Sequence, residues 1–141
     1  MKKTTAKHCE RITTRADRPI GRTISISAYA SSHPWEDFAE TWAHYLHIVD
    51  TLEMASEFGM EVRPPADQIG GLSAHIAFDP YRTENFDAIV AVWLPFTFAM
   101  NSVARAMGTR DLYPFILSPQ VIQKLSFIHG LVQETAKRHE R

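Results

Sequence analysis

Four side chains that can bind a metal ion or move protons recur at helical spacing in the first half of the chain. They are Glu36, Glu40, His44 and His47, separated by three or four residues each. On a helix with about 100° per residue, the two glutamates and His47 fall within about 40° of each other, and His44 lies close by. Carboxylate oxygens and imidazole nitrogens are ligands that zinc accepts, so this face is a candidate metal site.

The spacing alone leaves two interpretations open. Carboxylates four residues apart on a helix repel each other by roughly 0.2–0.5 kcal/mol, so a positive group nearby is favourable. That group could be a metal ion, a surface arginine or protonated His44. Solvation alone also produces polar faces of this kind, and one helix face does not supply three tetrahedral zinc ligands.

The segment that holds these residues is predicted to be a helix that begins within Ser31-Ser32-His33-Pro34 and ends near Phe58. A serine cap followed by proline is typical of a helix start. Glu36 and Asp37 in the first turn suit the helix dipole, and Gly59 is a typical helix end. An apolar stripe on another side is predicted to pack against the core; it consists of Trp35, Phe38, Trp42, Leu46 and Val49.

Two further helices and long loops complete the prediction. The second helix is expected over Thr83–Met107, with a kink or break at Pro95 because proline lacks a backbone N–H. The third is expected from Ser118-Pro119 to Lys137. Residues 60–81 are rich in proline and glycine and predict a loop, with a short helical turn at 66–69. The predicted fold class is all-α, with about three main helices, one of them kinked at proline.

Length and composition fit one soluble globular domain. The chain has 141 residues, of which 45% are hydrophobic and 22% charged. Residues 1–23 are polar, basic and without hydrophobic period, which predicts a flexible lead-in. The helical domain is expected over 24–137, followed by a tail at 138–141. Residues 24–29 alternate briefly, which fits a strand, a helix end or a loop.

Charge and apolar patterning argue against nucleic acid and membranes as partners. The formal net charge is -1, and the basic residues gather at the two ends without forming a stripe. The longest apolar stretch, Ala88 to Met100, contains Pro95 and is too short for a membrane span. No apolar run of signal-peptide length follows the first lysines. Cys9 is the single cysteine, so no internal disulfide can form, and a cytoplasmic location is expected.

The remaining histidines and aromatic residues are expected to have structural roles. His33, His75, His129 and His139 are isolated histidines, for which capping, packing or solvation is the simplest interpretation. The second predicted helix carries large apolar side chains that are expected in the core: Trp93, Phe96, Phe98 and Met100.

A longer run of residues resembles a known family. The run Ser27 to His47, which includes His-Pro-Trp-Glu-Asp and His-Tyr-Leu-His, resembles the bacterial "putative zinc-binding metallopeptidase" family. The likeness returns at Trp93–Thr97, Asn101-Ser102 and Asp111–Pro119, and it covers residues 24–136 overall. The resemblance implies the C-terminal helical subdomain of a zincin-like metallopeptidase, a zinc-dependent hydrolase of peptides.

The resemblance also implies roles for single residues. An upstream helix in that family carries His-Glu-x-x-His, whose histidines bind zinc and whose glutamate activates water. Glu36–Glu40 is similar to the Glu-x-x-Ala-Glu segment of lethal-factor-type zinc proteases, in which the first glutamate ligates zinc. This implies Glu36 as the ligand, with Glu40 orienting a histidine ligand through its ring N–H. The alternative is Glu40 as the ligand, with His44 one turn further along.

Three other residues in the matching segments receive weaker assignments. His44 and His47 are expected to surround the metal rather than to bind it. Tyr113 is a candidate for stabilising a developing oxyanion, although a buried tyrosine with a hydrogen-bonded hydroxyl is the simpler interpretation.

The sequence departs from the family pattern at one decisive point. It contains no His-Glu-x-x-His; the nearest fragment, His8-Cys9-Glu10, has the wrong spacing, and residues 1–23 do not resemble the family. We therefore expect a truncated, C-terminal piece that binds zinc and cleaves peptides only when a missing N-terminal half completes the site. The alternative is a non-catalytic helical binding protein, which could form a homo-oligomer through an exposed apolar surface.

Overall fold

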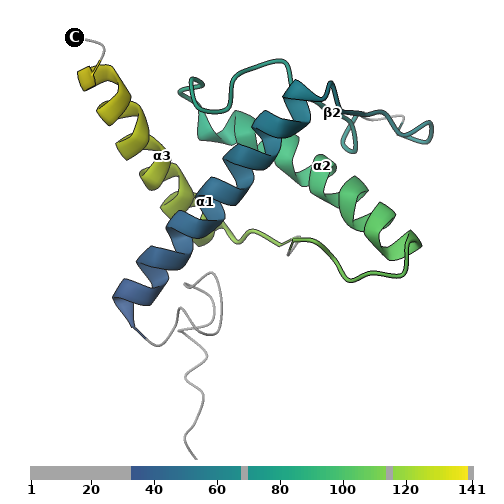
Figure 1. The fold of residues 1–141 in the computed structure, drawn as a ribbon, viewed down its shortest axis with the longest axis horizontal. Helices are drawn as coiled ribbons and strands as arrows, with labels where there is room; N and C mark the ends of the chain where they lie inside the picture. The colour runs from purple at the N-terminus through teal and green to yellow at the C-terminus, as the bar shows by residue number, and fades with distance from the viewer. Residues whose placement is uncertain (1–32, 68–69, 114–115, 140–141) are drawn as a thin grey trace, which may run out of the picture.

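Three helices make up most of the regular structure. The computed structural model describes residues 33–67, 70–113 and 116–139. Within them lie α1 (Pro34–Glu57), α2 (Phe86–Ala106) and α3 (Pro119–His139), and α1 crosses both other helices (Figure 1). The all-α prediction with three main helices is confirmed. The predicted flexible lead-in and the undecided segment at 24–29 lie outside the described residues.

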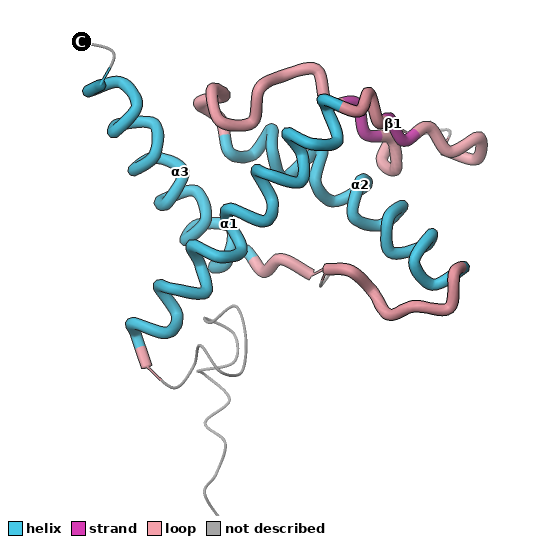
Figure 2. The backbone as a smooth tube through the Cα atoms, in the orientation of Figure 1, coloured by secondary structure: helices cyan, strands magenta, loops and turns pink. Residues whose placement is uncertain are grey.

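A two-stranded sheet in the connection between α1 and α2 was not predicted (Figure 2). Strand β1 (Glu61–Val62) pairs antiparallel with β2 (Ala74–His75), and Glu61 lies opposite His75. Two-residue strands are too short to show an alternating pattern in the sequence. At the start of the helical turn expected at 66–69, the amide of Asp67 donates to the carbonyl of Pro64 at 3.0 Å; residues 68–69 of that expected turn lie outside the described residues.

Caps and prolines fix the helix ends close to the predicted positions. At α1 the cap is His33 rather than a serine, because its Nδ1 accepts the amide of Trp35 at 3.2 Å. Gly59 follows α1 with φ 62°, a left-handed conformation that favours glycine. At α2 the cap is Asn85, so this helix begins three residues later than Thr83.

The buried face of α1 differs from the predicted apolar stripe. Trp35 is 74% exposed, and Phe38 and Leu46 are 43% and 40% exposed, so the prediction was wrong for these three residues. Of the predicted stripe only Val49 is fully buried, with Trp42 partly buried. The face turned toward the other elements instead carries Thr41, Tyr45, Ile48, Val49, Leu52 and Ala55. The predicted stripe followed the largest aromatic residues rather than the side that the other helices cover.

Helix α2 supplies the centre of the core. Trp93 and Phe96 are buried as predicted, whereas Phe98 is 42% exposed and Met100 is only partly buried. The helix continues through Pro95, so of the predicted kink or break the break is absent. Helix α2 is long and apolar enough to cross a membrane, and its most apolar stretch has a mean hydropathy of 1.4. The core helices of soluble proteins can have the same length and composition, so this is weak evidence. In this fold, 39% of that stretch is buried.

A buried hydrogen-bonded histidine connects all three helices. His129 of α3 is 2% exposed, and its Nδ1 accepts the hydroxyl of Tyr45 of α1 at 3.0 Å. Its Nε2 lies 2.6 Å from the carbonyl oxygen of Thr83, just before α2. Both bonds are satisfied by a neutral ring that carries its proton on Nε2. The expected packing role of His129 is confirmed, and the bonds fix how α1 is rotated about its axis.

Replacing Tyr45 with phenylalanine tests this network. Tyr45→Phe keeps the ring but leaves Nδ1 of His129 buried without a donor, which should cost about 1–3 kcal/mol in the free energy of unfolding. Tyr81→Phe is the matched control: the Tyr81 hydroxyl bonds to Asp50 at an exposed site, where water can replace it. Urea unfolding measures both variants. Equal losses in the two variants would contradict a special role for the buried bond.

Candidate functional site

The predicted polar face is a ridge along α1, which we call the α1 ridge and define as Glu36, Glu40, His44 and His47. The first three residues are partly buried, and His47 is exposed. The rings of His44 and His47 meet edge to face, with centroids 6.4 Å apart. Glu36 lies about two helical turns before His44, while Glu40 and His44 are one turn apart. The ridge therefore combines acidic and imidazole groups on one helix.

Two carboxylates in the first two turns of α1, those of Glu40 on the ridge and of Asp37 beside it, carry buried oxygen atoms without partners in the described part of the chain. Oε2 of Glu40 is buried and has no hydrogen-bond partner among the residues that the structure describes. In Asp37, Oδ2 pairs with the Lys124 ammonium of α3, while Oδ1 is buried and unpaired in the described part of the chain. An unpaired buried polar atom is costly, so these oxygens would gain from a cation or an N–H donor. From the sequence, Asp37 was expected only to favour the start of the helix.

Tyr113 reaches the ridge from a distant part of the sequence. Its hydroxyl is hydrogen-bonded to Nδ1 of His44, and the two ring centroids are 5.3 Å apart. Burial lowers the pKa of His44, an effect that the Glu40 charge opposes and His47 reinforces. Burial also raises the pKa of Tyr113 above its usual value. A neutral His44 thus accepts a hydrogen bond from the un-ionised Tyr113 hydroxyl, as expected for a hydrogen-bonded tyrosine.

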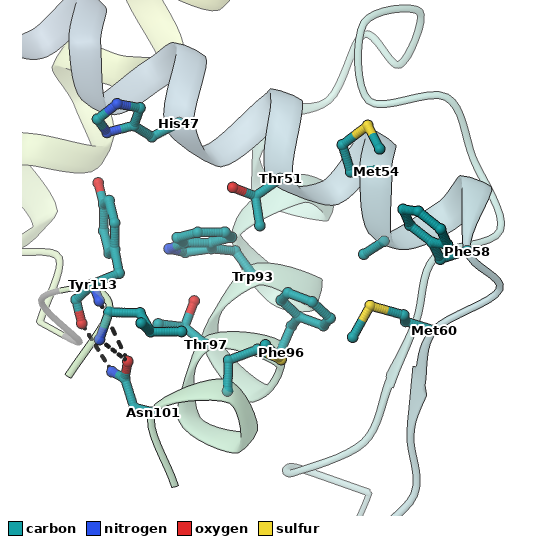
Figure 3. Close-up of a pocket in the computed structure, with 13 residues that line it drawn as sticks. His47, Thr51, Met54, Phe58, Met60, Trp93, Phe96, Thr97, Asn101 and Tyr113 are labelled. Carbon is teal, nitrogen blue, oxygen red and sulfur yellow. Dashed lines mark hydrogen bonds between the residues drawn. The ribbon is translucent and has the colours of Figure 1, made fainter. Parts of the chain in front are cut away.

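Asn101 of α2 holds Tyr113 in this position. Its side chain is 1% exposed, and Oδ1 accepts the amides of Leu112 at 2.9 Å and Tyr113 at 3.3 Å. Its Nδ2 donates to the carbonyl of Tyr113 at 2.8 Å (Figure 3). The Tyr113 ring also packs edge to face on Trp93 at 4.9 Å. In the sequence, Asn101 was noticed only within the family resemblance; an asparagine at a buried helix position is the signal that could have identified it.

A pocket of about 340 Å³ adjoins the ridge. It lies between α1, α2 and the loop that carries Tyr113 (Figure 3). Its wall includes His47, which is part of the ridge, and Tyr113, whose hydroxyl bonds to the ridge residue His44. The pocket was not predicted, because its walls come from separate segments of the chain: His47, Thr51, Met54, Ala55, Phe58, Met60, Trp93, Phe96, Thr97, Met100, Asn101, Leu112 and Tyr113.

The other predicted histidines lie away from the ridge face or cap its helix. His33 caps α1, and His75 is exposed in β2 with Nδ1 3.2 Å from the Glu61 carboxylate. His139, in the last turn of α3, is exposed and lies 2.9 Å from the carbonyl oxygen of Thr135. These positions agree with the structural and solvated roles expected from the sequence.

The ridge offers zinc ligand types but does not complete a zinc site. Within residues 33–67, 70–113 and 116–139, no group of three or more histidine, cysteine, aspartate or glutamate side chains could hold a metal ion. The carboxylates and imidazoles fit zinc chemically, and so does the unpaired oxygen of Glu40. The described residues supply zinc-ligand types but not by themselves a complete set of ligands.

Comparison with protein families decides the affiliation of the chain. The model of the family described as "Putative zinc-binding metallo-peptidase" matches residues 14–131. The chain belongs to this family. The match begins at residue 14, whereas the resemblance noted in the sequence begins at residue 24.

The curated relatives are considerably longer than this chain. The uncharacterized protein Rv2568c of Mycobacterium tuberculosis and the uncharacterized protein Mb2598c of Mycobacterium bovis are each 42% identical to it over 115 residues. The aligned region is 82% of this chain and 31% of each relative, so the chain spans about a third of their length. No solved structure matches the chain.

Removing the Asn101 side-chain bonds should release Tyr113. Asn101→Leu has a similar volume but removes the partner of the Leu112 amide and of the amide and carbonyl of Tyr113, at about 1–3 kcal/mol for each group that stays buried. Amide hydrogen exchange should become faster at Leu112 and Tyr113. In NMR spectra, the cross-peaks between the ring protons of Tyr113 and His44 should become weaker. Ser102→Ala, an exposed change on the same helix, is the control. Unchanged exchange at Leu112 would contradict the role of Asn101.

Proposed function

We propose that this chain supplies one side of the active site of a zinc-dependent peptidase. In this proposal a carboxylate of the α1 ridge binds the metal, and two histidines of a His-Glu-x-x-His motif outside this sequence complete the site. Membership of the zinc-binding family supports the metal, and the relatives' greater length leaves room for the motif in a whole protein. In the same proposal, the chain corresponds to the C-terminal part of the peptidase and is inactive by itself.

The observation that carries the proposal is the buried, unpaired Oε2 of Glu40. If Glu36 is the ligand, this oxygen accepts the ring N–H of a zinc-bound histidine and fixes its orientation. If Glu40 is the ligand, the oxygen faces the metal directly. The likeness to the Glu-x-x-Ala-Glu segment favours Glu36, and the burial of Oε2 favours Glu40. Both assignments give a partner to an atom that otherwise lacks one in the described structure.

The residues around the ridge suit the hydrolysis of a peptide bond. Zinc bound here would polarise the peptide carbonyl and make a bound water more acidic. The Tyr113 hydroxyl remains protonated because burial raises its pKa, so it can donate a hydrogen bond to developing negative charge. His44 holds that hydroxyl at the ridge in the absence of substrate. His47 lies at the edge of the adjoining pocket.

A second function is a non-catalytic helical binding module. Its motivation is the apolar surface of α1, where Trp35 is 74% exposed and Phe38 and Leu46 are 43% and 40% exposed. Such a surface fits a partner protein or a second copy of the chain. Under either function we propose a cytoplasmic bacterial protein without nucleic-acid or membrane partners; only the first function requires zinc and a peptide substrate.

Zinc affinity tests the proposed function. The sample is the longest natural polypeptide that contains this sequence, and the changes are Glu36→Gln and Glu40→Gln. Loss of the ligand should abolish stoichiometric zinc after dialysis, whereas loss of the orienting carboxylate should weaken zinc binding by about 10–100-fold. Metal content is measured by mass spectrometry, and competition with a chelator gives the affinity.

Glu57→Gln is the matched control, because Glu57 is an exposed glutamate at the other end of α1. It should bind zinc like the unmodified protein. Wild-type zinc affinity in both ridge variants would overturn the proposed function and leave the binding module as the better account.

A further inference from the structure

The pocket beside the ridge contains a buried hydroxyl that has no partner. Thr97 is 3% exposed, and its Oγ1 has no hydrogen-bond partner in the part of the chain that the structure describes. Helical threonines and serines commonly bond to the carbonyl four residues earlier. Thr41, Ser102 and Thr135 do so in this protein, at 2.6–2.8 Å. The buried Thr97 hydroxyl makes no such bond, and Thr97 lies on the pocket wall near Trp93 and Tyr113 (Figure 3).

The remaining walls suit a flat apolar group. The side chains that line them include three methionines and three aromatic residues: Met54, Met60, Met100, Phe58, Phe96 and Trp93. Methionine adapts to the shape of a ligand and makes favourable contacts with aromatic rings. The volume of about 340 Å³ lies in the range of small-molecule pockets. No acidic residue is among the described lining residues, which disfavours a lysine or arginine side chain as the occupant.

The pocket is continuous with the α1 ridge. His47 lies on the ridge and on the pocket wall, and Tyr113 lines the pocket while its hydroxyl bonds to His44. A peptide that placed one side chain in the pocket would bring its backbone to the ridge residues. The pocket can thus select which residue stands next to the bond that is cleaved.

We propose that this pocket binds a tyrosine side chain of the peptide substrate. The ring packs between the methionines and aromatic residues, and the phenol exchanges a hydrogen bond with Oγ1 of Thr97. A phenylalanine ring would leave that hydroxyl unpaired, and the indole of tryptophan is bulkier and can only donate. The proximity to the cleaved bond rests on the proposed function, whereas the preference for a phenol rests on the pocket alone.

Binding of p-cresol, the tyrosine side chain as a free molecule, tests the proposal. Titration followed by NMR should shift the signals of Thr97 and of the Trp93 indole. Thr97→Val removes the hydroxyl at nearly constant volume and should weaken p-cresol binding by about fivefold, the value of one ordinary hydrogen bond. Binding of toluene, which lacks the hydroxyl, should not weaken. The contrast between the two probes isolates the hydrogen bond from the apolar packing.

Two further variants control for location and folding. Thr135→Val deletes an exposed hydroxyl on α3 and should bind both probes like the unmodified protein. Thr51→Trp places a large ring on the pocket wall and should abolish binding of both. Thr97→Val should melt at the same or a higher temperature than the unmodified protein, because the deleted hydroxyl has no partner. The p-cresol titration of the unmodified protein locates the binding site without relying on this variant. No binding of p-cresol, or an equal effect of Thr97→Val on both probes, would overturn the proposal.

The probe experiment is independent of zinc. Glu36→Gln and Glu40→Gln should bind p-cresol normally even where they lose metal. If p-cresol binds through Thr97 but neither glutamate variant changes zinc binding, the preference of the pocket for a phenol is supported and its role in a peptidase is contradicted. If zinc binding depends on the glutamates but p-cresol does not bind, the proposed peptidase function is supported and the proposed tyrosine pocket is contradicted.

Discussion

The side chain of Asn101 fixes the geometry on which the candidate site depends. Its three hydrogen bonds tie the backbone of Leu112 and Tyr113 to α2, so the Tyr113 hydroxyl reaches His44 on α1. The same loop closes one wall of the pocket. A buried amide suits this task because it donates and accepts at once, and each backbone group that it satisfies would otherwise be costly to bury.

A second constraint sets the direction of the ridge. The Tyr45–His129 bond and the apolar contacts of Ile48 and Leu52 hold one face of α1 against the other helices. The helical period then turns Glu36, Glu40 and His47 away from that face. Nevertheless Oε2 of Glu40 is buried and, in the described residues, unpaired. An unpaired buried carboxylate destabilises a fold, and such costly features often occur at functional sites. Zinc would supply the missing partner.

The sequence predicted the elements better than the contacts between them. Pro34, Gly59 and Pro119 set helix ends through local backbone chemistry, and the period of the glutamates and histidines identified the ridge. The buried face of α1 was misassigned because large aromatic residues such as Trp35 and Phe38 lie on the uncovered side. The role of Asn101, the short strands and the pocket depend on residues distant in sequence, which no local period reveals.

The central claim is that a carboxylate of α1 is a zinc ligand. A crystal structure of the longest natural polypeptide containing this sequence, grown with zinc and measured at the zinc absorption edge, tests it most directly. We expect an anomalous peak at about 2.0–2.2 Å from a carboxylate oxygen of Glu36 or Glu40, with histidines completing the coordination. A zinc ion held without either glutamate, or a protein saturated with zinc only at unrelated surface sites, would contradict the account.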